Sequence, residues 1–149
     1  MRILIQRVIS ANVVVDCSVT GAIDHGLLLL VGITHTDTEA IEDRMAEKVL
    51  KLRIFGDENG LMNRSVVDIG GGILAVSQFT LYADATGGNR PSYTGAARCE
   101  QASPAFDRIV AKLAARLGKA VPTGVFGADM KVSLVNDGPV TIWLDSATL

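Results

Sequence analysis

The sequence has few cysteines and histidines and no long hydrophobic segment. Cys17 and Cys99 do not form a CxxC pair, and His25 and His35 have no cysteine or carboxylate in ligand spacing. We therefore expect reduced thiols and no zinc site. The longest apolar run, residues 26–33, is far below the roughly 20 residues that span a bilayer. No secretory signal opens the chain, so we expect a cytoplasmic protein that does not contact membranes.

A strong charge of either sign is also lacking. Fourteen Lys and Arg residues stand against sixteen Asp and Glu residues, a formal net charge of −2. A chain of this charge is not expected to bind nucleic acid without regard to sequence, although a local basic patch could hold the end of an RNA. The 149 residues, 48% of them hydrophobic, suffice for one domain over residues 1–149. We assign the mean hydropathy of +0.32 to a large core and a buried subunit interface.

Hydrophobic patterns predict a sheet of seven or so strands. The Val- and Ile-rich opening, residues 2–15, predicts a strand, and a turn at 16–21 leads to a short return strand. Residues 26–33 form a continuous apolar run, which is typical of a strand buried on both faces. Further strands are predicted at 73–82, 121–123, 130–135 and 140–144.

Two segments have the three- and four-residue apolar spacing of a helix. The first follows a capping box at 36–39 and continues to Leu52. The second begins with Ser103 as N-cap and Pro104 as first helical residue, and Gly118 ends it. Two helices among these strands predict an α+β fold, with the helices packed on a mostly antiparallel, barrel-like sheet.

Three polar segments interrupt the hydrophobic pattern. Residues 77–81, Ser-Gln-Phe-Thr-Leu, either alternate toward solvent or need partners, since an unmade buried hydrogen bond costs about 1–3 kcal/mol. Residues 136–141, Asn-Asp-Gly-Pro-Val-Thr, have turn chemistry, which by itself predicts a plain hairpin connection. The Gly-rich segment 83–95 predicts an ordinary surface loop.

Segments 77–81 and 136–141 together closely resemble the two signature motifs of the D-aminoacyl-tRNA deacylase (D-tyrosyl-tRNA deacylase) family. Either motif alone is a weak signal, but both in one short chain are a strong one. The resemblance covers almost the whole chain, because further landmarks follow in the family's order at 6–8, 52–55, 62–66, 90–92 and 126–130.

This resemblance implies a homodimeric hydrolase that removes D-amino acids from the 3′ end of tRNA without metal or organic cofactor. It also implies the removal of glycine mischarged on alanine tRNA, a form of translation quality control. The family's first motif places the wall that holds the ester and its attacking water at Ser77, Gln78, Phe79 and Thr80.

The second motif, by the same resemblance, performs chiral proofreading. In the family its Gly-Pro bond is cis and reaches into the partner subunit's active site, so Gly138 and Pro139 would form this gate with Arg7 behind it. Their carbonyls would occupy the space that an L-Cβ needs, whereas glycine has no Cβ to exclude. Phe126 and Met130 would embrace the terminal adenine, although the pattern alone makes both core residues.

The expected chemistry needs no histidine, because an aminoacyl ester is already an activated acyl group. Positioned water and oxyanion donors, such as the backbone N–H groups near Phe79 and Thr80, would suffice. In the family the terminal ribose 2′-hydroxyl helps to activate this water. Two alternatives stay open. One is an amidohydrolase with Thr80 as nucleophile, for which no base stands out. The other is a non-catalytic module that binds the tRNA acceptor end.

One stretch departs from the family. Many relatives carry basic residues just before 90–92, where this chain has Thr-Gly-Gly-Asn at 86–89 and keeps Arg90 alone. Each lost phosphate contact weakens RNA affinity and reduces its salt dependence. Either tRNA binding is weaker in this protein, or Arg98, Lys112 and Lys119 compensate.

Overall fold

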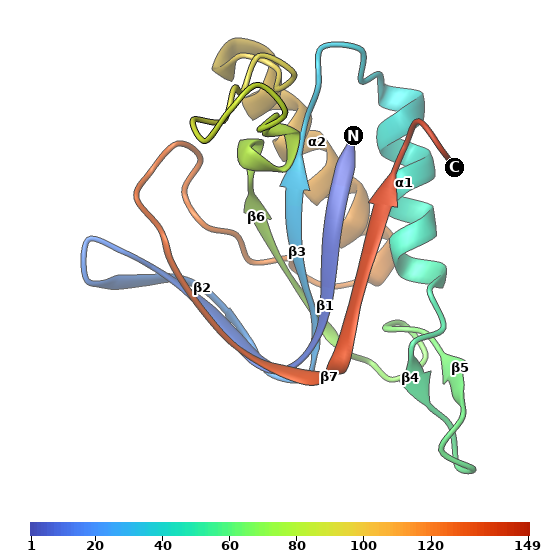
Figure 1. Cartoon of the computed structure of the whole chain (residues 1–149). Helices are drawn as coiled ribbons and strands as arrows, with labels where there is room; N and C mark the ends of the chain where they lie inside the picture. Colours follow the sequence, from blue (N-terminus) through green and yellow to red (C-terminus); the bar gives the residue numbers. More distant parts are fainter.

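The fold is a curled, half-barrel sheet with two helices on one face (Figure 1). A computed structural model describes residues 1–149. The only parallel pair of strands is β3 with β6. The prediction of an α+β fold with two helices and a mostly antiparallel sheet is therefore confirmed. The main sheet contains β1 (Arg2–Val15), β2 (Ser18–Ile23), β3 (Gly26–Gly32), β6 (Gly72–Ser77) and β7 (Lys131–Asp145), and β4 (Phe55–Gly56) pairs with β5 (Met62–Arg64).

Strand β1 organises the sheet. Its first half pairs with β3, its second half pairs with β2, and its opposite edge pairs with β7 along almost the whole length. Ile3 and Ile5 alternate with less buried residues and face the helices, as the predicted strand at 2–15 requires. The predicted strand at 26–33 is also confirmed. β3 is buried on both faces, because Leu27 and Leu29 pack in the core under the helices and Leu28 packs in the smaller cluster on the other face.

The predicted strands at 130–135 and 140–144 form one strand, β7, and the hairpin prediction for 136–141 is wrong. Both halves of β7 pair with β1, Asn136 with Val8 and Thr141 with Gln6. Four residues, 137–140, therefore stand opposite a single β1 residue, Arg7, and bulge out of the sheet. The turn-forming residues of this segment form a bulge rather than a hairpin, because the chain pairs with β1 again at Thr141, directly after them.

The strand predicted at 73–82 ends early, at Ser77. Gln78 N still donates to Val31 O at 2.8 Å, but β3 ends at Gly32 and no partner strand continues. The chain then closes a 3-10 turn, η1 (Phe79–Tyr82), with Leu81 N bound to Gln78 O at 3.2 Å. The strand predicted at 121–123 is reduced to one bridge between Thr123 and Ala75.

Both helices exist, with shifted starts. α1 (Glu39–Lys51) has Thr38 as N-cap, whose hydroxyl accepts from Ile41 N, so the capping box predicted at 36–39 is misplaced by two residues. α2 (Cys99–Leu117) begins four residues before the predicted N-cap and contains Pro104. The buried stripe of α2 begins at Ala102, before the proline. Packing of this residue in the core extends the helix upstream of Pro104. Gly118 ends α2 in the left-handed conformation, as predicted.

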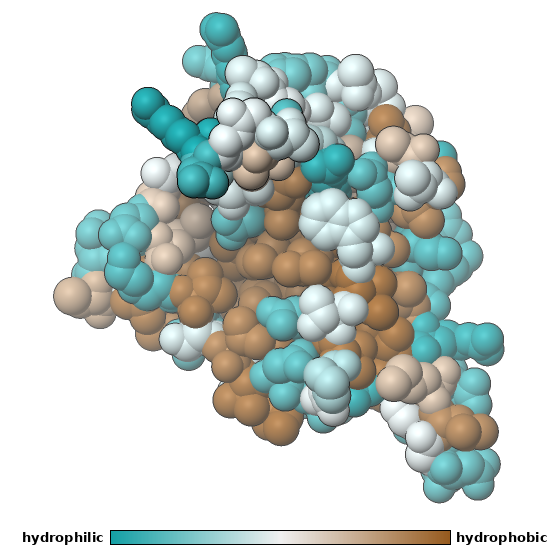
Figure 2. Space-filling model, in the orientation of Figure 1, coloured by the Kyte–Doolittle hydropathy of each residue, from teal (hydrophilic) through white to brown (hydrophobic).

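The helices cover one face of the sheet and leave the other face open. In Figure 2 the open side shows an apolar area over the sheet. Large side chains of β1 and β7 stay about half exposed, among them Ile9, Val135 and Trp143. No helix is both long and apolar enough to cross a bilayer.

A fully buried acidic side chain joins the two helices. Glu42 on α1 has no exposed surface, and Arg108 on α2 binds both of its carboxylate oxygens, with the Nη2 atom 2.7 Å from Oε1. Lys112 Nζ lies 3.3 Å from Oε2. A buried carboxylate needs such partners, so these contacts fix α1 against α2.

Removing Arg108 alone should destabilise the protein more than removing both charges. Arg108→Met leaves the buried Glu42 with Lys112 as its one cation, and we expect the free energy of unfolding to fall. The double variant Glu42→Leu/Arg108→Met should recover at least half of that loss. Urea unfolding followed by circular dichroism measures both, and a double variant less stable than Arg108→Met would contradict this account.

Candidate active site

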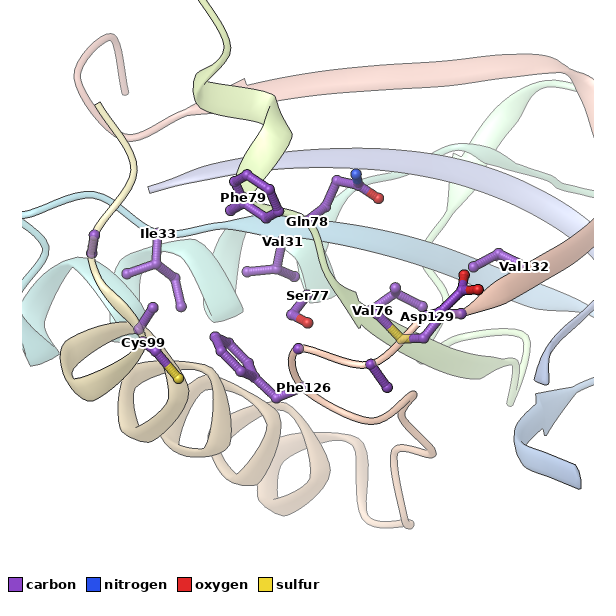
Figure 3. Close-up of a pocket in the computed structure, with 15 residues that line it drawn as sticks. Val31, Ile33, Val76, Ser77, Gln78, Phe79, Cys99, Phe126, Asp129 and Val132 are labelled. Atoms are coloured by element: carbon purple, nitrogen blue, oxygen red, sulfur yellow. The ribbon is translucent and has the colours of Figure 1, made fainter. Parts of the chain in front are cut away.

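A cleft of about 380 Å³ opens at the carboxyl ends of β3 and β6 (Figure 3). The start of α2 and the segment 126–132 close its other sides. Most of its lining is apolar, so the cleft suits a flat, largely apolar group rather than a charged one. Five predicted site residues line it, from two distant parts of the chain: Ser77, Gln78, Phe79, Phe126 and Met130.

The end of β6 presents the first motif to this cleft. Ser77 is the last strand residue, and the turn into η1 brings Gln78 and Phe79 to the wall opposite Phe126 (Figure 3). Phe79 is 57% exposed and packs edge-on against Tyr93, with ring centroids 5.1 Å apart. The first hydrogen bond of η1 begins at Leu81 N, so the N–H groups of Phe79 and Thr80 precede it.

Thr80 is not among the residues that line the cleft. Its Oγ1 accepts a short hydrogen bond from the Gln78 amide and has no contact with an imidazole, carboxylate or amine. His25 and His35 do not line the cleft either. No three His, Cys, Asp or Glu side chains gather in a way that could hold a metal ion.

Phe126 and Met130 are partly core and partly cleft residues. The Phe126 ring packs against Phe106 at 6.2 Å between centroids, and Met130 packs against the apolar cluster inside the curled sheet. Gly124 makes room for this arrangement, because a Cβ there would stand 2.3 Å from Met130 Sδ. The hydrophobic pattern therefore predicted correctly that Phe126 and Met130 pack in the core. The structure adds that both side chains also line the cleft.

The second motif forms the bulge at 137–140, and the Gly138–Pro139 peptide bond is cis. Arg7 lies behind it: its Nε donates to Asp137 O at 3.0 Å and pairs with Asp137 Oδ2 at 2.9 Å. The Asn136 amide donates to Arg7 O at 3.0 Å and to Val140 O at 3.1 Å. These bonds replace the ladder contacts that the bulge interrupts and hold Gly138 and Pro139 outward, exposed.

One chain does not bring the two motifs together. Arg7 pairs with Leu27, which pairs with Ile73, four residues before Ser77 on β6. At the rise of a strand this separates the bulge from the cleft by about 13 Å along the strands, before the distance across the sheet is added. The cleft and the bulge therefore occupy opposite ends of the sheet.

Sequence reasoning missed three contributors to these two regions. Asn136 and Asp137 act through side chains that only the bulge directs toward Arg7. Cys99 lines the cleft and was not assigned to it, because the helix was expected to begin at Ser103. Its position as first residue of α2 follows from the apolar stripe that begins at Ala102.

The chain matches proteins of one family over almost its whole length. A family model described as D-Tyr-tRNA(Tyr) deacylase matches residues 4–145. D-aminoacyl-tRNA deacylases from Dechloromonas aromatica (strain RCB) and Chromobacterium violaceum are 59% and 62% identical to it over 146 residues, covering 98% of this chain and 97% of each relative.

Two solved structures show the same architecture. One described as a c-Myc DNA unwinding element binding protein is 39% identical, with a TM-score of 0.91 over 97% of this chain and 98% of its own. A probable eukaryotic D-amino acid tRNA deacylase is 15% identical, with a TM-score of 0.83 over 96% of this chain and 97% of its own, and shows the fold alone.

Sequence, fold and cleft thus define a hydrolase that acts on aminoacyl-tRNA. The chain belongs to the D-Tyr-tRNA(Tyr) deacylase family, together with the D-aminoacyl-tRNA deacylases to which it is similar. The family resemblance stated from segments 77–81 and 136–141 is confirmed.

Gly138→Ala should remodel the bulge. A Cβ at this position would stand 2.1 Å from Val140 N, a backbone atom, and 2.6 Å from Asn136 Oδ1, in an amide that two hydrogen bonds hold in place. We expect a loss of about 1–3 kcal/mol in the free energy of unfolding, because the bulge has to open. Gly87→Ala is the matched control, since its Cβ meets nothing within 4 Å. Urea unfolding of both variants tests this, and equal stability of the two would contradict it.

Proposed function

We propose that residues 1–149 form one deacylase domain that acts as a cytoplasmic homodimer and hydrolyses the ester between a D-amino acid and the 3′ end of tRNA. The main support is the cleft, which gathers the first motif with Phe126 and Met130. The cytoplasm is where aminoacyl-tRNA is made and used.

The cleft fits the terminal adenosine. A volume of about 380 Å³ lies within the range of small-ligand sites, and the lining offers an aromatic ring and a thioether to the faces of a base. Stacking of a base on an aromatic side chain is worth about 1–3 kcal/mol. Phe126 and Met130 embrace the adenine, and the ester then lies at the opposite wall, beside Ser77, Gln78 and Phe79.

Water is the nucleophile in this proposal. Backbone N–H groups of Phe79 and Thr80 stabilise the oxyanion that develops when water attacks the ester carbonyl, and the terminal ribose 2′-hydroxyl helps to activate the water. Thr80 as a covalent nucleophile would need a base at hydrogen-bond distance, whereas its Oγ1 contacts only the Gln78 amide. Gln78 and Thr80 instead act as a pair that orients the wall.

Gly138 and Pro139 of one protomer select the chirality in the cleft of the other. Two observations support action across a dimer. The bulge and the cleft lie at opposite ends of the sheet within one chain, and the open face of the sheet carries apolar side chains. With the α-ammonium and carbonyl fixed, the carbonyls of Gly138 and Pro139 occupy the place of an L-Cβ. Glycine has no Cβ, so glycine mischarged on alanine tRNA is removed as well.

The first test compares D-Tyr-tRNA, L-Tyr-tRNA and Gly-tRNA side by side with the purified protein. We expect loss of the D- and glycyl esters and survival of the L-ester, because a gate that works by exclusion cannot reject glycine. Survival of all three esters would favour a non-catalytic module that binds the acceptor end. Equal cleavage of the L- and D-esters would support the hydrolase activity but contradict the proposed role of Gly138 and Pro139 in selecting chirality.

Action across the dimer predicts complementation between two defective chains. Gln78→Ala/Thr80→Ala impairs the cleft, and Gly138→Ala impairs the gate. A heterodimer of these chains has one cleft and one gate that are both intact and face each other. Co-expression with two different affinity tags isolates it, and we expect about half the D-selective activity per dimer of the unmodified protein. A heterodimer no better than either variant homodimer would show that gate and cleft act within one chain.

A further inference from the structure

The cleft offers almost no cation to a polyanionic substrate. Asp129 is the one charged side chain in its lining, and Lys131 pairs with it at 2.6 Å. Contacts with phosphates supply a large part of the affinity of proteins for nucleic acids. In a chain of net charge −2, those contacts require a local group of cations elsewhere.

The last turns of α1 carry such a group. Arg44, Lys48 and Lys51 are spaced at i, i+4 and i+7, so they share one exposed face about 10 Å long. Together with Arg53 they line a hollow of about 420 Å³, to which Glu47 and the last residue, Leu149, add the acidic groups. We call these four cationic residues the α1 basic surface.

Two of the four cations have no partner inside the protein. Glu47 pairs with Lys51, and Arg44 donates to a backbone carbonyl near the end of the chain. Lys48 and Arg53 are exposed and take part in no hydrogen bond or ion pair of their side chains. Their charges are therefore available to a ligand, and substitution of either residue breaks no hydrogen bond or ion pair within the protein.

One end of the α1 basic surface, at Arg53, lies next to the residues behind the bulge that carries Gly138 and Pro139. Arg7 donates one hydrogen bond to Ile54 O, the residue after Arg53, and another to Asp137 O, the residue before Gly138. Figure 1 shows the C-terminal end of α1 beside β4, at the lower end of the sheet where β7 bends. In a dimer whose gate reaches into the partner subunit's cleft, the Arg53 end of this surface would accompany the gate toward that cleft.

We propose that the α1 basic surface of one protomer binds acceptor-stem phosphates of the tRNA whose aminoacyl end occupies the partner subunit's cleft. This inference rests on the proposed function, because only a gate acting across the dimer places the surface there. It identifies Lys48 and Arg53 as cations that compensate for the uncharged stretch 86–89.

Charge reversal with two substrates tests the inference. Lys48→Glu and Arg53→Glu are each assayed on full-length D-Tyr-tRNA and on the D-tyrosyl ester of the trinucleotide CCA, which has no acceptor stem. On the tRNA we expect kcat/KM to fall about 5–10-fold at low salt and the slope of its logarithm against log salt to fall by about 0.7–0.9 per lost contact. On the trinucleotide ester, kcat/KM should stay within about twofold, since no stem phosphate is involved.

Arg90→Glu is the comparison variant, an equal change of charge on the exposed loop where relatives carry basic residues. On the tRNA it should lower kcat/KM less than either α1 variant does, because this loop offers one cation alone, and on the trinucleotide ester kcat/KM should stay within about twofold. Equal losses on both substrates for Lys48→Glu and Arg53→Glu, no loss on the tRNA, or a larger loss for Arg90→Glu would each overturn the inference. Failure of the unmodified protein to cleave either substrate would instead overturn the deacylase activity on which it rests.

Discussion

The pairing of β7 with β1 across the bulge at 137–140 is the constraint on which the rest of the structure depends. β1 holds β2, β3 and β7 together, so any interruption of the β1–β7 pairing has to be compensated locally. Arg7 and Asn136 supply that compensation, since their side chains satisfy backbone carbonyls that the ladder no longer pairs. The bulge is thus a fixed projection of the sheet rather than a loop free to move.

The two signature motifs lie in separate regions of one chain. The cleft forms where β3 and β6 end and the chain turns into η1, whereas the bulge forms in β7 opposite Arg7, at the level where β3 begins. A second copy, packed on the apolar face of the sheet, is the simplest way to bring a bulge to a cleft. In the proposed dimer, the same contact buries apolar surface, completes the site and supplies its chiral selectivity.

The charged side chains of α1 differ between its two halves. Its N-terminal half directs Glu42 and Asp43 toward cations of α2, with Arg116 2.7 Å from Asp43, and these pairs fix the helix in place. Its C-terminal half keeps Lys48 free of internal partners, and Arg53 follows directly after the helix. A low net charge therefore coexists with a local cationic surface, because most carboxylates near the helices are already paired within the protein.

The sequence by itself determined the elements whose signals are local. The strands at 2–15 and 26–33, the two apolar helical stripes, the glycine stop at Gly118 and the family membership all follow from residue patterns that no distant contact alters. Tertiary structure decided the rest. Residues 136–141 read as a hairpin because a bulge uses the same turn chemistry, and only renewed pairing with β1 distinguishes the two. Residues 78–82 leave the sheet because β3 ends at Gly32, and Phe126 turns one face to the cleft because α2 packs on the other. Such outcomes depend on partners remote in the chain, and no local pattern encodes where a partner strand ends.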